Sequence, residues 1–211
     1  MKAIMHCPDS DSGELIIVGG PYKSGTSNLC AAIEAWGYGN PACITNPQEQ
    51  GQGLTVSLYE TRECSVARAW NRTLITSGTS EANCIERRTA FYLIEMTYRL
   101  GARLVIKDPY MKLTAPHWAH AARRVGIQKI RVVIAVRDPQ FVRRSQERSR
   151  FMRWQLRKHP DVFRQMSAPL DRKVYNQLHQ HGCSVKFWHY ENVHGNPPPV
   201  GPFLEWSRWS V

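Results

Sequence analysis

The feature that most constrains the fold is a short apolar run that ends in two glycines and leads directly into a helical pattern. Residues 14–19 read ELIIVG, a run rich in β-branched side chains, and apolar residues recur at helical spacing from about Ser27 to Trp36. Glycine allows the chain to turn tightly between the two segments. The sequence therefore predicts a strand, a tight loop and a helix in direct succession.

The same alternation continues along the chain. Further strands are predicted in ARLVIKDP, where Pro109 ends the run, in KIRVVIAV (129–136) and at 185–188. Helices are predicted from near Glu60, and over 85–100, 116–125, 140–158 and 170–181, whereas 37–53 and TSGTSEAN (76–83) are expected to be irregular loop and polar linker. We therefore expect an α/β fold: one P-loop-like domain over residues 1–211, with three layers and a mainly parallel sheet of about four or five strands between helices.

Composition limits the class of protein. The chain has 211 residues, of which 42% are hydrophobic, and this suits one core. With no apolar run long enough to span a membrane, and with acids near the N-terminus, we expect a soluble cytoplasmic protein without a membrane partner. The six cysteines form no CxxC pair and the histidines lack zinc spacing, so no metal is expected. The net charge of +11 favours an anionic partner, whether nucleotide, nucleic acid or acidic substrate.

The segment GGPYKSGTS (19–27) lies where the first strand meets the first helix. Backbone amides there can converge on an anion at the positive end of the helix. Gly20 and Gly25 have the separation of an ATP-binding Walker A loop, but Thr26 occupies the position of its lysine, and Lys23 lies inside the loop instead. These residues predict a phosphate-binding loop of a different type.

A second phosphate motif follows the most apolar strand. In RVVIAVRDPQFVRRS, Arg137 comes directly after the strand, and Ser145 follows eight positions later. A guanidinium offers two parallel donors to a phosphate, and a hydroxyl in the first turns of the next helix adds another. The arginines further along this helix are spread evenly around it, and we expect them mostly to be solvated and in part to steer anions.

The two motifs, in this order, resemble the 5′-phosphosulfate loop and the 3′-phosphate signature of the sulfotransferases that use 3′-phosphoadenosine 5′-phosphosulfate (PAPS). Two weaker segments are similar to others of that family: Lys107-Asp108-Pro109, followed by Pro116 and Trp118, and VKFWHYENV, which contains Tyr190. The resemblance runs from about residue 14 to 195. It implies a transferase that moves a sulfuryl group from PAPS to a hydroxyl or amine of an unidentified small-molecule or carbohydrate acceptor and leaves 3′,5′-bisphosphoadenosine (PAP).

The resemblance also assigns candidate site residues. Lys23 is implied as the catalytic cation, and the implied cofactor-binding residues are Pro21, Tyr22, Lys23, Ser24, Gly25, Thr26, Ser27, Arg137, Ser145 and Tyr190. The general base stays open because Pro109 stands where many members have a histidine. NPQEQGQGLTVSLYE resembles a pattern that points to Glu60, with Asp108 as the second candidate and His117 as a distant third. The family needs no metal.

Two other classes of function remain as alternatives. A small P-loop kinase would bind ATP and Mg²⁺, and the lack of a lysine after Gly25 counts against it. A non-catalytic basic protein that binds nucleic acid would account for the charge but leaves both phosphate motifs unexplained. Nucleic acid is therefore the less favoured partner.

Overall fold

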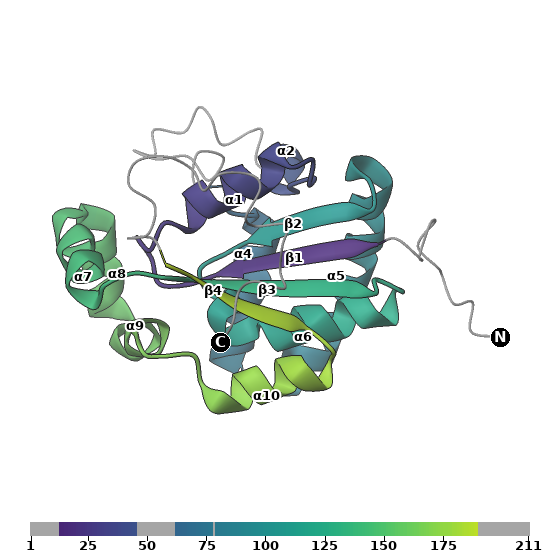
Figure 1. Cartoon of the computed structure of the whole chain (residues 1–211). Coiled ribbons are helices and arrows are strands. Elements are labelled where there is room, and N and C mark those ends of the chain that lie inside the picture. The colour runs from purple at the N-terminus through teal and green to yellow at the C-terminus, as the bar shows by residue number, and fades with distance from the viewer. Residues whose placement is uncertain (1–12, 46–61, 78, 190–211) are drawn as a thin grey trace.

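The protein is an α/β domain built on a parallel sheet. The computed structural model describes residues 13–45, 62–77 and 79–189. Its four strands are β1 (Glu14–Gly19), β2 (Arg103–Lys107), β3 (Lys129–Val136) and β4 (Ser184–His189). They lie in the order β2-β1-β3-β4, and every neighbouring pair is parallel (Figure 1). The predicted fold class is confirmed.

Helices cover both faces of the sheet. Side chains alternate along a strand, so that Leu15 and Ile17 pack on one face, whereas Ile16 and Val18 pack on the other. The first face is covered by α4 (Ser65–Ser77), α5 (Thr79–Leu100), α6 (Met111–Arg124) and α10 (Arg172–Gln180). The second is covered by α1 (Thr26–Ala35), and the short α2 (Ala42–Thr45) follows it. These are the three predicted layers.

The central position of β1 determines where its loop meets other strands. All six residues of β1 are buried, and the strand pairs with β2 on one side and with β3 on the other. Gly19, the last residue of β1, is in register with Ile134 near the end of β3. Because parallel strands end at the same edge, the chain leaves β1 and β3 side by side, at the point where the strand order reverses.

A three-helix unit extends beyond this edge. It consists of α7 (Pro139–Arg148), α8 (Arg150–Lys158) and α9 (Pro160–Ser167), drawn in green at the left of Figure 1. The predicted single helix over 140–158 is wrong, because Ser149 has extended backbone angles and separates α7 from α8. The helix α9 was not predicted at all.

Other element boundaries also differ from the prediction. The expected linker 76–83 is wrong: α4 continues to Ser77 and α5 begins at Thr79, because Ala82 and Ile85 give this polar stretch a buried face. The helix α6 begins at Met111 and contains Pro116, which is buried among apolar neighbours. The segment 37–53 is not wholly irregular, since it includes α2, and the helix expected from near Glu60 is described only from Ser65 onwards. No helix in the described ranges is long and apolar enough to cross a membrane.

Candidate functional site

The loop after β1 requires glycine at two positions. Gly20 has a φ of +147°, and a Cβ there would lie 2.7 Å from the carbonyl oxygen of Ala135 and 3.0 Å from Ser24 Oγ. Gly25 has a φ of +90° and forms the N-cap of α1. Both conformations are accessible to glycine and strained for larger residues. The loop is therefore held close to the end of β3 by the backbone itself.

The start of α1 carries the features of an anion site. Gly25 has no side chain that could cap the first amides, and the first turn contains no acidic residue. The amides of a helix N-terminus without a cap keep their partial positive charge available to a ligand. Within the loop, Ser24 Oγ is buried and has no hydrogen-bond partner among the described residues. Thr26 is buried and Ser27 is half-buried, and this donor set fits a phosphate or phosphosulfate group.

The structure brings the two predicted phosphate motifs together. The guanidinium of Arg137, one residue beyond β3, donates from Nη1 to the backbone carbonyl of Lys23 at 3.0 Å. On α7, the buried Gln146 donates from Nε2 to the carbonyl of Tyr22 at 3.1 Å. Ser145 precedes Gln146 and is half-buried. Residues more than 110 positions apart in the chain thus share one side of the loop.

Lys23 and Tyr22 point to different surroundings. Lys23 is exposed and adopts a φ of +70°, a conformation that few residues other than glycine take up. The Tyr22 ring stacks on Phe163 of α9 at 5.6 Å and meets Tyr110 edge-on at 5.8 Å. Burial, and then the charge of Asp108, raise the pKa of the Tyr22 hydroxyl. Pro21 closes the turn by accepting a hydrogen bond from the amide of Ser24 at 3.1 Å. Tyr22 therefore anchors the loop, while Lys23 faces solvent.

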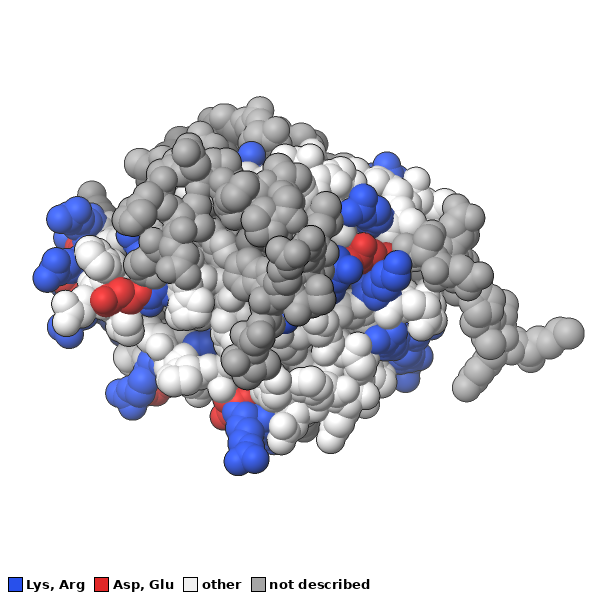
Figure 2. Space-filling view, in the orientation of Figure 1, with Lys and Arg blue, Asp and Glu red and all other residues white. Residues whose placement is uncertain are grey.

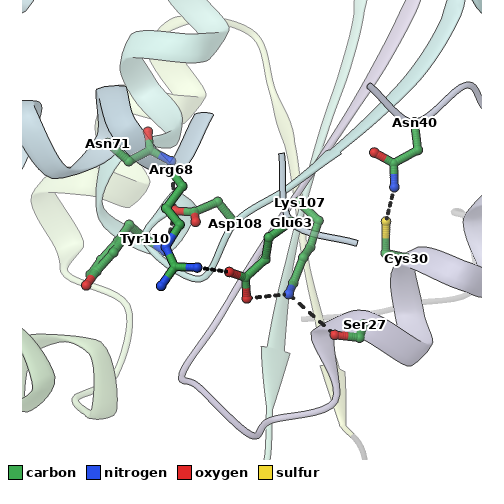
Figure 3. Close-up of polar contacts among 9 residues, drawn as sticks. All are labelled: Ser27, Cys30, Asn40, Glu63, Arg68, Asn71, Lys107, Asp108 and Tyr110. Carbon is green, nitrogen blue, oxygen red and sulfur yellow. Dashed lines mark hydrogen bonds and ion pairs between the residues drawn. The ribbon is translucent and has the colours of Figure 1, made fainter. Parts of the chain in front are cut away.

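A buried ion pair adjoins the loop helix (Figure 3). Lys107, the last residue of β2, donates from Nζ to Glu63 Oε1 at 2.9 Å and to Ser27 Oγ at 3.4 Å. Glu63 Oε2 accepts from Arg68 at 3.1 Å. A second cation is thus in contact with the first turn of α1. Glu63 was not predicted as a site residue, and its only signal in the sequence is a second acid soon after Glu60 in the stretch YETRE.

Asp108 is enclosed by hydrogen-bond donors from α4 and the start of α6. It is fully buried, and its Oδ1 accepts from Asn71 Nδ2 at 2.9 Å and from the amide of Tyr110 at 3.0 Å. Asn71 Oδ1 in turn accepts from Thr114 and from Trp118 Nε1, both at 2.8 Å. Burial, and to a lesser degree the charge of Glu63, raise the pKa of Asp108 to about 6. The carboxylate of Asp108 therefore binds a proton more readily than an ordinary aspartate does, but it has no contact with solvent.

Of the remaining predicted site residues, one pairs away from the loop and two lie outside the residues that the structure describes. His117, on α6, has its Nδ1 2.7 Å from Glu86 Oε1 of α5, and thus pairs away from the loop. Glu60 and Tyr190 lie outside the described residues. No group of three or more histidine, cysteine, aspartate or glutamate side chains that could hold a metal ion occurs within 13–45, 62–77 and 79–189.

The fold and the loop define a candidate anion site at the switch point of a parallel α/β sheet. Comparison with known proteins adds no family to this class: no protein-family model matches the sequence, and no curated protein sequence matches it significantly. The loop, Arg137 and the Lys107–Glu63 pair are therefore the features of the chain that bear on its function.

Proposed function

We propose that the protein is a PAPS-dependent sulfotransferase. The observation that carries the proposal is the hydrogen bond from Arg137 to the carbonyl of Lys23, because the two sequence motifs that we propose to bind phosphate are in direct contact through it. PAPS carries phosphate groups on the 3′ and the 5′ oxygen of one ribose, so it would need two such elements at one edge of the sheet. ATP has no 3′-phosphate and needs only the loop.

Each element would have a separate task. The amides at the start of α1 and the hydroxyls of Thr26 and Ser27 would hold the 5′-phosphosulfate, and Arg137 would hold the 3′-phosphate, with Ser145 as an additional donor. PAPS supplies the activated sulfuryl group, whose bond to the leaving phosphate breaks as a bond to the acceptor oxygen or nitrogen forms. Lys23, exposed at the loop, would stabilise the negative charge that develops on the leaving phosphate.

The proton of the acceptor must pass to a base. Glu60 remains our first candidate and Asp108 the second, whose raised pKa of about 6 is favourable for proton transfer near neutral pH. The full burial of Asp108, however, is unfavourable for direct contact with an acceptor. The carboxylate of Glu63 already accepts hydrogen bonds from Lys107 and Arg68. We therefore assign Glu63 to positioning Lys107 and not to accepting the proton.

Calorimetry with PAP, ATP–Mg²⁺ and a DNA duplex tests the nucleotide assignment. We expect only PAP to bind tightly, and Arg137→Ala to weaken PAP binding by about tenfold or more, as the loss of a bidentate phosphate contact implies. Arg124→Ala is the matched control, since Arg124 is an exposed arginine at the end of α6 and lies outside the candidate site. Tighter binding of ATP–Mg²⁺ would favour a kinase, and tighter binding of DNA would favour a nucleic-acid-binding protein.

The catalytic role of Lys23 is tested with labelled PAPS and a panel of hydroxyl and amine acceptors. We expect Lys23→Ala to abolish transfer while PAP binding changes little, because alanine keeps the Cβ and so adds no strain to the positive φ. Far-UV circular dichroism would check that the variant is folded. Unchanged turnover in Lys23→Ala would refute this assignment without affecting the nucleotide assignment.

A further inference from the structure

A groove separate from the anion site runs along the seam between α4 and α5. Its volume is about 540 Å³. The α5 side is formed by residues that recur every three or four positions and so share one face of the helix: Arg88, then Phe91 and Tyr92, then Glu95 and Met96, then Arg99. At 1.5 Å per residue, this face extends about 16 Å from Arg88 to Arg99. Trp70 of α4 lies on the opposite side.

The floor of the groove is apolar and already packed. Met96 and Tyr92 are 2% and 8% exposed, and Trp70 meets Tyr92 edge-on at 5.6 Å. Trp70 also lies 6.0 Å from the buried Trp118, and this contact ties the floor to the core. Phe91 forms a wall and is 62% exposed. A rigid aromatic floor beside an exposed phenyl ring favours a flat or elongated apolar ligand, because binding would remove that ring from water.

The charges around the groove favour an anionic group on that ligand. Arg99 forms an ion pair with Glu95 at 2.8 Å, so these two charges offset each other. Arg88 is exposed at the other end, and no carboxylate of the described residues pairs with it. One guanidinium therefore remains to bind an anion at one end of an apolar surface.

We propose that the groove binds an amphipathic anion, with the apolar part of the ligand against Trp70, Phe91 and Tyr92 and a single carboxylate or sulfonate against Arg88. The volume of the groove lies within the usual range of small-molecule sites, about 300–1,000 Å³. The site is distinct from the phosphate loop but not isolated from it. Tyr92 Oη lies 3.0 Å from the sulfur of Cys64, the residue next to Glu63. The ligand would thus bind close behind the Lys107–Glu63 pair.

The test uses two fluorescent probes of similar apolar shape. One is 8-anilinonaphthalene-1-sulfonate, which is anionic, and the other is N-phenyl-1-naphthylamine, which is neutral. We expect Phe91→Ala to raise the Kd of both probes by about fivefold or more, and Arg88→Ala to raise the Kd of the sulfonate alone. The matched controls are Tyr98→Ala and Arg87→Ala, which alter an exposed aromatic ring and an exposed guanidinium of the same helix outside the groove.

The outcomes are separable from those of the nucleotide experiments, since neither probe is a nucleotide. Equal effects of the lining and control variants, or a loss of neutral probe binding in Arg88→Ala, would overturn the proposal. Sedimentation velocity tests whether a second copy of the chain occupies the groove instead. A wild-type dimer that Phe91→Ala converts to a monomer would assign the groove to a second copy of the chain and would equally overturn it. All four substituted side chains are exposed, so the variants are expected to fold.

Discussion

Among single residues, Asp108 has surroundings that lead to a pH dependence of stability. Its pKa in the folded protein is about 6, against an ordinary value of 3.8. Between these two values the folded protein retains a proton that the unfolded chain has lost, so this group makes stability fall as the pH rises. We expect the free energy of unfolding of the wild type to decrease between pH 4 and pH 7, relative to Asp108→Asn, by on the order of 2 kcal/mol.

Urea denaturation of both proteins at the two pH values measures this difference. For each protein, the change in the free energy of unfolding between the two pH values is measured first, and the two changes are then compared. This is needed because the amide in Asp108→Asn would itself change the absolute stability. Asp161→Asn is the control, since Asp161 is 80% exposed on α9 and should leave the pH dependence unchanged. Parallel pH profiles for the wild type and Asp108→Asn would show that Asp108 ionises normally.

The strand pattern of the sequence was sufficient to predict that the loop of Lys23 and Arg137 lie at one edge of the sheet, but not that Glu63 lies there too. The loop that contains Lys23 follows β1, Arg137 comes directly after β3, and the carboxyl ends of parallel strands meet at one edge. Glu63 reaches Lys107 across 44 positions, from irregular backbone in which Arg62 has a φ of +54°. Such a contact depends on how a loop crosses the sheet edge, which no local pattern specifies. Glu60 and Tyr190 lie outside the described residues, so their roles stay predictions.

At the scale of elements, boundaries with a strong local cause were predictable. The strand β3 has the predicted range, and α5 ends before Gly101, whose φ of +93° ends the helix. Boundaries that depend on packing between elements were not predictable from the sequence. Proline usually ends a helix, yet Pro116 lies within α6. The helix continues through it because Met111, Ala115 and Trp118 bury one face of α6 in the core. Tertiary burial outweighed the local signal there.

A lysine of α6 contacts the C-terminal end of α9. Lys112 of α6 is 3% exposed, and its Nζ donates to the carbonyls of Met166, at 2.7 Å, and of Ala168 at the end of α9. A cation at the C-terminus of a helix satisfies carbonyls that lack partners and interacts favourably with the helix dipole. Burial lowers the pKa of Lys112 to about 8, so the contact should weaken above that pH.

We expect Lys112→Met to accelerate amide hydrogen exchange in α9 by about tenfold, the equivalent of about 1.4 kcal/mol, while exchange in β1 stays unchanged. Mass spectrometry of peptides that cover 160–168 and 14–19 would measure both. Lys173→Met serves as control, because Lys173 is exposed on α10. Equal exchange of α9 in the wild type and Lys112→Met would mean that other contacts hold this helix.

For the whole molecule, positive charge is concentrated beside the candidate site. The three-helix unit, residues 139–167, contains eight basic and two acidic residues, a formal charge of +6 out of the +11 of the chain. Figure 2 shows lysine and arginine side chains gathered at the left, where Figure 1 draws α7 and α8. Such a field attracts anions over a distance that depends on ionic strength. The unit is therefore expected to influence how fast an anionic ligand arrives.

On the proposed function, the association rate constant of PAP should fall as NaCl is raised from about 20 to 200 mM. Charge reversal of Arg144 and Arg157 together should lower that rate constant several-fold at low salt and leave the dissociation rate constant nearly unchanged. Stopped-flow fluorescence measures both constants. A change confined to the dissociation rate constant would show that these arginines contact the ligand directly.

The stacking of Tyr22 between α6 and α9 has one further consequence. Its ring contacts Tyr110 and Phe163 on one side of the chain, while its carbonyl is held by Gln146. On the proposed function, the loop that would hold the anion is therefore fixed in place by these contacts before a ligand binds. Little conformational entropy should then be lost on binding, and most of the electrostatic attraction remains available as affinity.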